Sequence, residues 1–343
     1  MKKHAIIPIF IPHEGCPNDC VFCNQKKITA RQQPVEASDV KDIIEQYLTT
    51  LAGRGLETIE VAFFGGSFTG LSIEKQSSYL AVAKAYKENG QIDKIHLSTR
   101  PDYINEEILT NLKNYGVDII ELGVQSFDEE VLKQSNRGHD STIVYESCRL
   151  IKGFGFELGI QLMIGLPGDT HEKSIYSAKE TVKIGPSIAR LYPTIVIEDT
   201  ELYEMYCHGS YQPLSQEEAI DTTKEMVQIL NQAGIRIIRI GLKSTDLIQE
   251  NGVISGGTYH PAFRQLVESE IAKEMLENQL TNLQNNSLSD PLVLSFESNQ
   301  KCFSNMIGNK RSNKEYFASK YPHIKIVYKT NSFLADHQYI VIQ

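Results

Sequence analysis

The chain has 343 residues, of which 41% are hydrophobic and 22% are charged, and its formal net charge is −9. The length suits one large domain, or a large domain with a small one, and the negative charge argues against a surface built for nucleic acid or an anionic membrane. No apolar run approaches the roughly 20 residues that a membrane span needs. Residues 1–15 have a short apolar part broken by Pro8 and Pro12, which predicts a first strand rather than an export signal. We therefore expect a cytoplasmic protein with no membrane partner.

Short apolar runs alternate with amphipathic segments from residue 5 to about residue 240. The runs predict strands at 5–10, 58–64, 93–98, 118–124, 157–164, 189–196 and 235–241. The segments between them predict helices at 38–53, 73–89, 105–115, 128–136, 140–153, 171–185 and 215–233. Ser215 and Glu218 form the pattern of a capping box at the start of the last helix. This alternation predicts an α/β fold with a parallel sheet, and six or seven such units suit a barrel or an open partial barrel.

The pattern changes after about residue 245. A glycine-rich loop at 251–261, a helix at 262–280 and a polar linker at 281–291 lead into a small α+β module. We therefore divide the chain into a barrel, residues 1–245, and a C-terminal extension, residues 246–343. The module carries a run of basic residues, which is either a solvated face or a contact surface for an anionic partner such as RNA. These residues are Lys301, Lys310, Arg311, Lys314, Lys320, Lys325 and Lys329.

Three of the six cysteines, Cys16, Cys20 and Cys23, stand within eight residues as C-x3-C-x2-C. Thiolates are soft ligands that suit an iron–sulfur cluster or zinc. Four-iron clusters usually take four cysteines, so three local ligands leave one iron open unless a distant cysteine completes the set. The alternative is a structural zinc site completed by His13 or a remote cysteine, although no second cysteine pair follows. The other cysteines are isolated, as small buried residues often are: Cys148, Cys207 and Cys302.

The cysteine spacing, with Phe22 just before the last cysteine, resembles the radical S-adenosylmethionine (SAM) superfamily. The resemblance implies a [4Fe–4S] cluster on the three cysteines, with S-adenosyl-L-methionine bound at the open iron. It also implies reductive cleavage of the sulfonium to a 5′-deoxyadenosyl radical, which abstracts a hydrogen atom from a substrate. The electron would come from a reductant protein such as flavodoxin or ferredoxin.

The ends of the second and third predicted strands carry motifs similar to those of the same superfamily. Gly65 and Gly66 resemble the family's GGE-type motif, which takes the amino group of the cofactor, and Ser67 stands where the family often has a carboxylate or a threonine. Ser98 and Arg100 are the polar groups at the end of the next strand, in a segment similar to one in the elongator catalytic subunit. The resemblance implies a contact from Ser98 to the cofactor's ribose or carboxylate. The alternative is that residues 101–102 simply begin the next helix.

Gln125 and Arg137 flank the segment after the fourth predicted strand. This segment resembles one shared by oxygen-independent coproporphyrinogen III oxidases and the radical domain of the elongator catalytic subunit. The resemblance implies that both residues contact SAM, and a guanidinium can bind a carboxylate through two hydrogen bonds. The alternative for Arg137 is a cap at the C-terminal end of a helix.

The end of the fifth predicted strand, GIQLMIGLPG, is also similar in these relatives. The resemblance implies that Gly165 lies beside the adenine of the cofactor. Gln161 stands where the coproporphyrinogen oxidases have an aspartate, and it is expected to hydrogen-bond a ribose hydroxyl as a neutral partner. Each motif follows its own strand, as function at the carboxyl ends of barrel strands requires.

The sequence thus predicts a partial (β/α)6-type radical SAM barrel followed by a small α+β C-terminal module. The predicted function is a radical SAM enzyme with an unknown final substrate. The resemblance weakens beyond about residue 240, so the complete activity of neither relative is expected here. The alternatives are an RNA-binding or tRNA-modifying factor that uses the basic module, and a scaffold stabilised by zinc.

Overall fold

A computed structural model describes residues 3–11, 16, 20–24, 35–242, 254–284 and 292–343. Seven parallel strands form one curled sheet in the order β1-β2-β3-β4-β5-β6-β8, which confirms the predicted partial barrel. These strands are β1 (His4–Ile11), β2 (Thr58–Gly65), β3 (Lys94–Thr99), β4 (Ile119–Gln125), β5 (Glu157–Ile164), β6 (Ile188–Pro193) and β8 (Arg236–Ile240).

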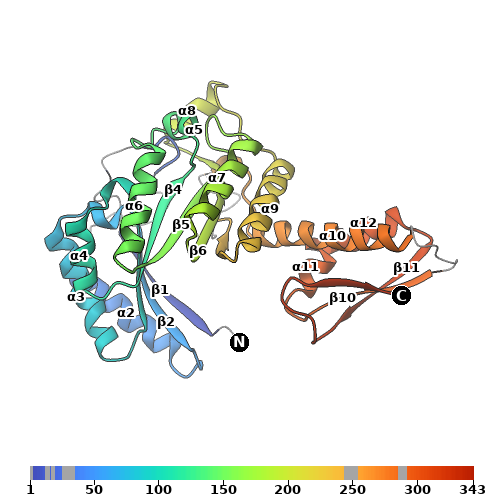
Figure 1. Cartoon of the computed structure of the whole chain (residues 1–343), viewed down its shortest axis with the longest axis horizontal. Helices are drawn as coiled ribbons and strands as arrows, with labels where there is room; N and C mark the ends of the chain where they lie inside the picture. The colour runs from blue at the N-terminus through green and yellow to red at the C-terminus, as the bar shows by residue number, and fades with distance from the viewer. Residues whose placement is uncertain (1–2, 12–15, 17–19, 25–34, 243–253, 285–291) are drawn as a thin grey trace.

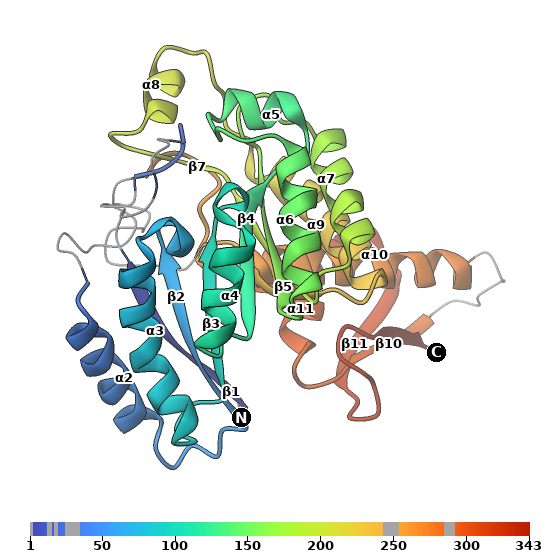
Figure 2. The same cartoon turned by 60° about the vertical axis from the view of Figure 1, so that its left-hand side comes forward.

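Helices cover the outer face of this sheet, and Figure 2 shows α3, α4, α6 and α7 side by side in front of the strands. Most begin with a side-chain cap, and the predicted box of Ser215 and Glu218 is present at α9. The helices of the barrel are α2 (Ala37–Leu51), α3 (Ile73–Glu88), α4 (Glu106–Asn114), α5 (Glu129–Gln134), α6 (Ser141–Gly153), α7 (His171–Ile184), α8 (Glu201–Cys207) and α9 (Gln216–Gln232), with short 3-10 turns η1 (Phe68–Gly70) and η2 (Pro101–Tyr103).

The edge strand β1 has one buried face and one partly exposed face. Ile7, Ile9 and Ile11 are buried against the helices, whereas Ile6 and Phe10 on the other face are 38% and 42% exposed. A parallel sheet covered on both faces would bury both sets. The strands therefore form a half-barrel whose hydrophobic core lies between the sheet and its outer helices.

One predicted strand and one predicted loop differ from the structure. The strand predicted at 189–196 breaks at Thr194 into β6 and the short β7 (Ile195–Ile197). β7 pairs antiparallel with β9 (Ile254–Gly257), so the segment predicted to be a glycine-rich loop contains a strand. Gly257 has φ +86°, and a Cβ there would lie 2.7 Å from the Thr194 carbonyl oxygen. The glycine is thus needed for close strand contact rather than for a loop.

The C-terminal module is a three-stranded sheet in the order β11-β10-β12 with helices on one face. Figure 1 shows α10 running from beside α9 into this module. Phe263 at the start of α10 belongs to the barrel core, and Leu276 and Leu280 belong to the module core. The elements are α10 (Phe263–Gln284), β10 (Leu292–Ser298), α11 (Phe303–Ile307), η3 (Asn309–Arg311), α12 (Ser312–Lys320), β11 (Ile324–Thr330) and β12 (Tyr339–Ile342).

The α+β character of the module agrees with the sequence, and the boundary at residues 245 and 246 stays a prediction. No helix in the described part of the chain is long and apolar enough to cross a membrane.

Candidate functional site

The cysteine segment follows β1, at the edge of the sheet where the carboxyl ends of the parallel strands meet. Cys20 is only 5% exposed, and Cys16 and Cys23 are half-buried. The Cys23 N–H donates to the Cys20 carbonyl at 2.9 Å, which makes a tight turn between the last two cysteines. None of the three forms a disulfide. His13, the alternative zinc ligand, lies outside the described residues.

Backbone hydrogen bonds fix this segment between α5 and α8. The Val21 N–H donates to the Ser135 carbonyl at 3.2 Å, and the Val21 carbonyl accepts from the Leu202 N–H at 2.7 Å. Phe22 packs against an apolar cluster that contains Val21, Leu202 and Tyr211. The side chain of Phe22 therefore anchors the cysteine segment to the body of the protein.

Two arginines point at the sulfur of Cys20. Arg137 Nη1 lies 3.1 Å from Cys20 Sγ, and Arg137 Nη2 donates to the Gly123 carbonyl at 2.5 Å. Arg100 Nη1 lies 3.6 Å from the same sulfur. Both arginines are buried, at 3% exposure for Arg100 and 4% for Arg137. Two buried guanidinium groups therefore present N–H donors to one cysteine sulfur.

Cys16 lies in the same electrostatic environment. Burial raises the pKa of the Cys16 thiol above its usual value, and the charge of Arg100 and a hydrogen bond from Ser67 work in the opposite direction. Ser67 is buried directly after β2. Ser67 therefore contacts a cysteine in this structure, although the sequence assigned it to SAM.

Gly65 and Gly66 lie against the end of β1. Gly65 has φ +109°, and a Cβ there would collide with the Ile11 carbonyl oxygen. The same oxygen accepts a hydrogen bond of 2.9 Å from the Gly66 N–H. The two glycines thus allow the end of β2 to lie close to the end of β1. Ser98, on β3, donates a long hydrogen bond of 3.4 Å to the Phe63 carbonyl.

Gln125 and Gln161 meet on the sheet. Gln161 Nε2 donates to Gln125 Oε1 at 3.2 Å. Gln125 is buried and has φ +72° at an irregularity in the pairing of β4 with β5. A non-glycine residue in this left-handed region costs about 1 kcal/mol or more, and such outliers gather at functional sites.

Gly165 is held within its own turn. It has φ +79°, its N–H donates to Asp169 Oδ2 at 2.8 Å, and its carbonyl accepts from the Tyr211 hydroxyl at 2.5 Å. Burial raises the pKa of the Asp169 carboxyl, against the hydrogen bonds from Gly165, Ser174 and Thr170. Asp169 therefore orders the turn and was not singled out from the sequence.

The structure brings Cys16, Cys20, Ser67 and Arg137 together. Within its described residues, no three His, Cys, Asp or Glu side chains already form a ready ligand set for a metal ion. The donor chemistry nevertheless suits an iron–sulfur cluster, because the cysteines form no disulfide and the Cys20 sulfur faces buried N–H donors.

Sequence reasoning named Arg100 as a polar residue at a strand end but gave it no role. The fork that its guanidinium makes with Asp102, with Arg100 Nε to Oδ1 and Nη2 to Oδ2 both at 2.9 Å, orients it toward Cys20. The usable signal was the pair of opposite charges two residues apart at the end of a strand.

A polar chain that sequence reasoning also missed crosses the interior of the half-barrel. His96 Nδ1 lies 2.6 Å from Glu60 Oε1, and Arg190 Nε donates to Glu121 Oε2 at 2.7 Å. The Arg190 guanidinium also lies 4.6 Å from the centre of the Phe64 ring. Charged residues inside otherwise apolar strands were the signal for this chain.

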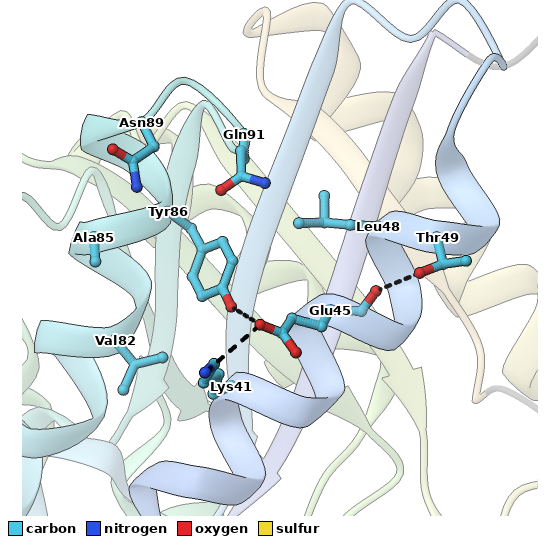
Figure 3. Close-up of a pocket in the computed structure, with 9 residues that line it drawn as sticks. All are labelled: Lys41, Glu45, Leu48, Thr49, Val82, Ala85, Tyr86, Asn89 and Gln91. Atoms are coloured by element: carbon cyan, nitrogen blue, oxygen red, sulfur yellow. Dashed lines mark hydrogen bonds and ion pairs between the residues drawn. The ribbon is translucent and has the colours of Figure 1, made fainter.

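A groove of about 640 Å³ lies on the outside of the barrel between α2 and α3 (Figure 3). Tyr86 donates to Glu45 Oε1 at 2.9 Å inside it, and burial together with Glu45 raises the pKa of Tyr86 to about 12. None of its lining residues belongs to the predicted site.

Two family models match the chain in succession. Residues 10–177 match the Radical SAM superfamily, and residues 186–273 match the Radical_SAM C-terminal domain. A tRNA uridine(34) acetyltransferase of Methanocaldococcus infernus is 28% identical over 256 residues, covering 63% of this chain and 48% of its own length. Elongator complex protein 3 of Dictyostelium discoideum is 30% identical over 270 residues, covering 66% of this chain and 48% of its own. The chain thus spans about half the length of these curated relatives.

The solved structure of the archaeal Methanocaldococcus infernus Elp3, with residues 1–46 deleted, matches with a TM-score of 0.63 and 26% identity. The match covers 80% of this chain and 64% of that one. Fold, cysteine segment and family matches therefore agree, and the predicted resemblance is confirmed. The chain belongs to the radical SAM superfamily, whose enzymes bind a [4Fe–4S] cluster and cleave S-adenosylmethionine.

Proposed function

We propose that Cys16, Cys20 and Cys23 hold the [4Fe–4S] cluster and that SAM binds at the iron left without a cysteine. The observation that carries this proposal is the contact of Arg137 with Cys20, because it joins the cysteine segment to a predicted SAM residue. The residues proposed to contact SAM are Phe22, Gly65, Gly66, Ser67, Ser98, Gln125, Arg137, Gln161 and Gly165.

When bound, the cluster and SAM supply a 5′-deoxyadenosyl radical for hydrogen abstraction. The chain's own part is to bind, orient and exclude water. The segment around Cys20 is buried and held by backbone hydrogen bonds at Val21. Arg137 is held by the Gly123 carbonyl, so a carboxylate beside the cluster would meet a guanidinium that is already oriented.

We further propose that the substrate is an RNA. One relative is named as a tRNA uridine(34) acetyltransferase, and this supports RNA as the substrate class. In the module, Lys301 and Lys320 pair with Asp336 and Glu277, whereas other basic side chains are exposed: Lys310, Arg311, Lys314, Lys325 and Lys329. Exposed cations of this kind suit a phosphate backbone.

We also propose a cytoplasmic location and a reductant of the flavodoxin or ferredoxin type. None of the six cysteines forms a disulfide, which supports a reducing compartment.

Anaerobic reconstitution of the full chain tests the ligand assignment. We expect about four irons and four sulfides per chain in the wild type. C16S, C20S and C23S should each lose most of the cluster, and C207S, at an exposed cysteine of α8, should keep it. A full cluster in all three variants would overturn the assignment.

A further inference from the structure

We infer that Arg100 is a positioning residue that hydrogen-bonds the Cys20 ligand and raises the reduction potential of the cluster. The inference rests on the proposed function, because it requires Cys20 to be a ligand. Nothing in the sequence or in the family matches gives Arg100 this role.

The Arg100 guanidinium has a partner for each of its three nitrogens. Nε and Nη2 donate to the two oxygens of Asp102, each at 2.9 Å, and Nη2 also donates to the Arg137 carbonyl. Nη1 is left to face Cys20 Sγ at 3.6 Å. A planar fork can make these contacts at once, whereas a lysine ammonium on a flexible stem cannot.

Arg100 also hydrogen-bonds the backbone of Arg137, whose guanidinium is the other N–H donor of the site. The Arg137 carbonyl accepts from Arg100, while the Arg137 side chain reaches Cys20. The loss of Arg100 would therefore loosen both N–H donors at the Cys20 sulfur. Because the Arg100 guanidinium is buried, its charge would be costly to leave without these partners.

Hydrogen bonds to a ligand sulfur stabilise the more negative, reduced state of a cluster. Replacing Arg100 by a residue without a guanidinium should therefore make the cluster harder to reduce. The effect belongs to the cluster itself, so it can be measured without any substrate.

The test compares wild type, R100Q and R100K with R149Q, which removes an exposed arginine of α6. Each full chain is reconstituted anaerobically, its iron and sulfide are counted, and its cluster is titrated with a reductant in the absence of SAM. Resonance Raman then gives the iron–thiolate stretching frequencies.

We expect R100Q to have a lower midpoint potential, so that its reduced-to-oxidised ratio at the wild-type midpoint falls about tenfold. R100K, which keeps the charge but not the fork, should lie between R100Q and wild type. R149Q should match wild type in potential and in stretching frequency.

A loaded R100Q with the wild-type potential and stretching frequency would overturn the inference while the proposed function stands. If R100Q takes up no cluster, the potential of R100K is the test. A wild-type potential in R100K would then overturn the inference. A wild-type chain that takes up no four-iron cluster would instead overturn the proposed function, and the inference with it.

Discussion

Arg137 Nη1 lies 3.1 Å from Cys20 Sγ, although 117 positions separate the two residues in the sequence. The family resemblance implied a contact of Arg137 with SAM, and the structure places its guanidinium beside the middle cysteine. Both placements agree if SAM binds beside this cysteine, because one guanidinium can then face a sulfur and a carboxylate.

Substitution R137K should weaken SAM binding about tenfold to a hundredfold, because a lysine keeps the charge but loses the planar fork. Equilibrium binding of SAM to the oxidised, reconstituted protein measures this. R149K, on the exposed face of α6, is the matched control and should bind as wild type does. Unchanged affinity in R137K would remove Arg137 from the SAM site.

Substitution G65A should lower the free energy of unfolding by about 2 kcal/mol or more, because Gly65 has φ +109° and its Cβ would strike the Ile11 carbonyl. The control is G153A on α6, where a Cβ would meet open space. Urea unfolding of both variants measures the difference. Equal stability of G65A and G153A would contradict the close contact of β2 with β1.

The Glu60–His96 pair should make the folded protein less stable as the pH falls into the acid range. Burial alone raises the pKa of Glu60, but the hydrogen bond and charge of His96 outweigh it and hold that pKa below its usual value. The stabilisation is therefore complete above the ordinary glutamate pKa of about 4.3 and is lost as the pH falls through the lowered folded-state value.

Between about pH 5 and about pH 3, wild type should lose more stability than E60Q, which has no carboxylate to protonate. Thermal unfolding across this range measures the loss, with E146Q on α6 as an exposed control. Parallel curves for wild type and E60Q would show that the pair contributes nothing.

The exposed lysines of β11 test RNA as a substrate class. Replacing Lys325 and Lys329 by glutamine should reduce the salt dependence of tRNA binding by about one in slope per lysine. Lys301 and Lys320, which pair with Asp336 and Glu277, are the control and should matter less. Equal effects of the two double variants would argue against a specific RNA surface on β11.

Local rules were enough to predict most of the barrel. Hydrophobic period and capping signals located the strands and helices, down to the box of Ser215 and Glu218. The break at Thr194 was missed because β7 pairs with β9, about sixty residues further along the chain. Such a pairing depends on tertiary contacts, and nothing in the apolar run 189–196 indicates it.

The sequence predicted which strand ends carry the site residues, but it did not predict which of these residues contact one another. Sequence position placed Ser67, Arg100 and Arg137 at one edge of the sheet, because parallel strands share that edge. It could not show that Ser67 and Arg100 face the cysteines, since side-chain direction depends on how each turn leaves its strand. Polar residues inside the half-barrel, such as Glu121, were visible as charges within apolar strands, but their partners on other strands depend on the tertiary fold.

Cleavage of SAM by the reconstituted protein distinguishes a radical SAM enzyme from a chain that only binds a cluster. With dithionite as reductant, the wild type should release 5′-deoxyadenosine from SAM, and C20S should release none. A wild-type chain with an intact four-iron cluster that never cleaves SAM would overturn the proposed function.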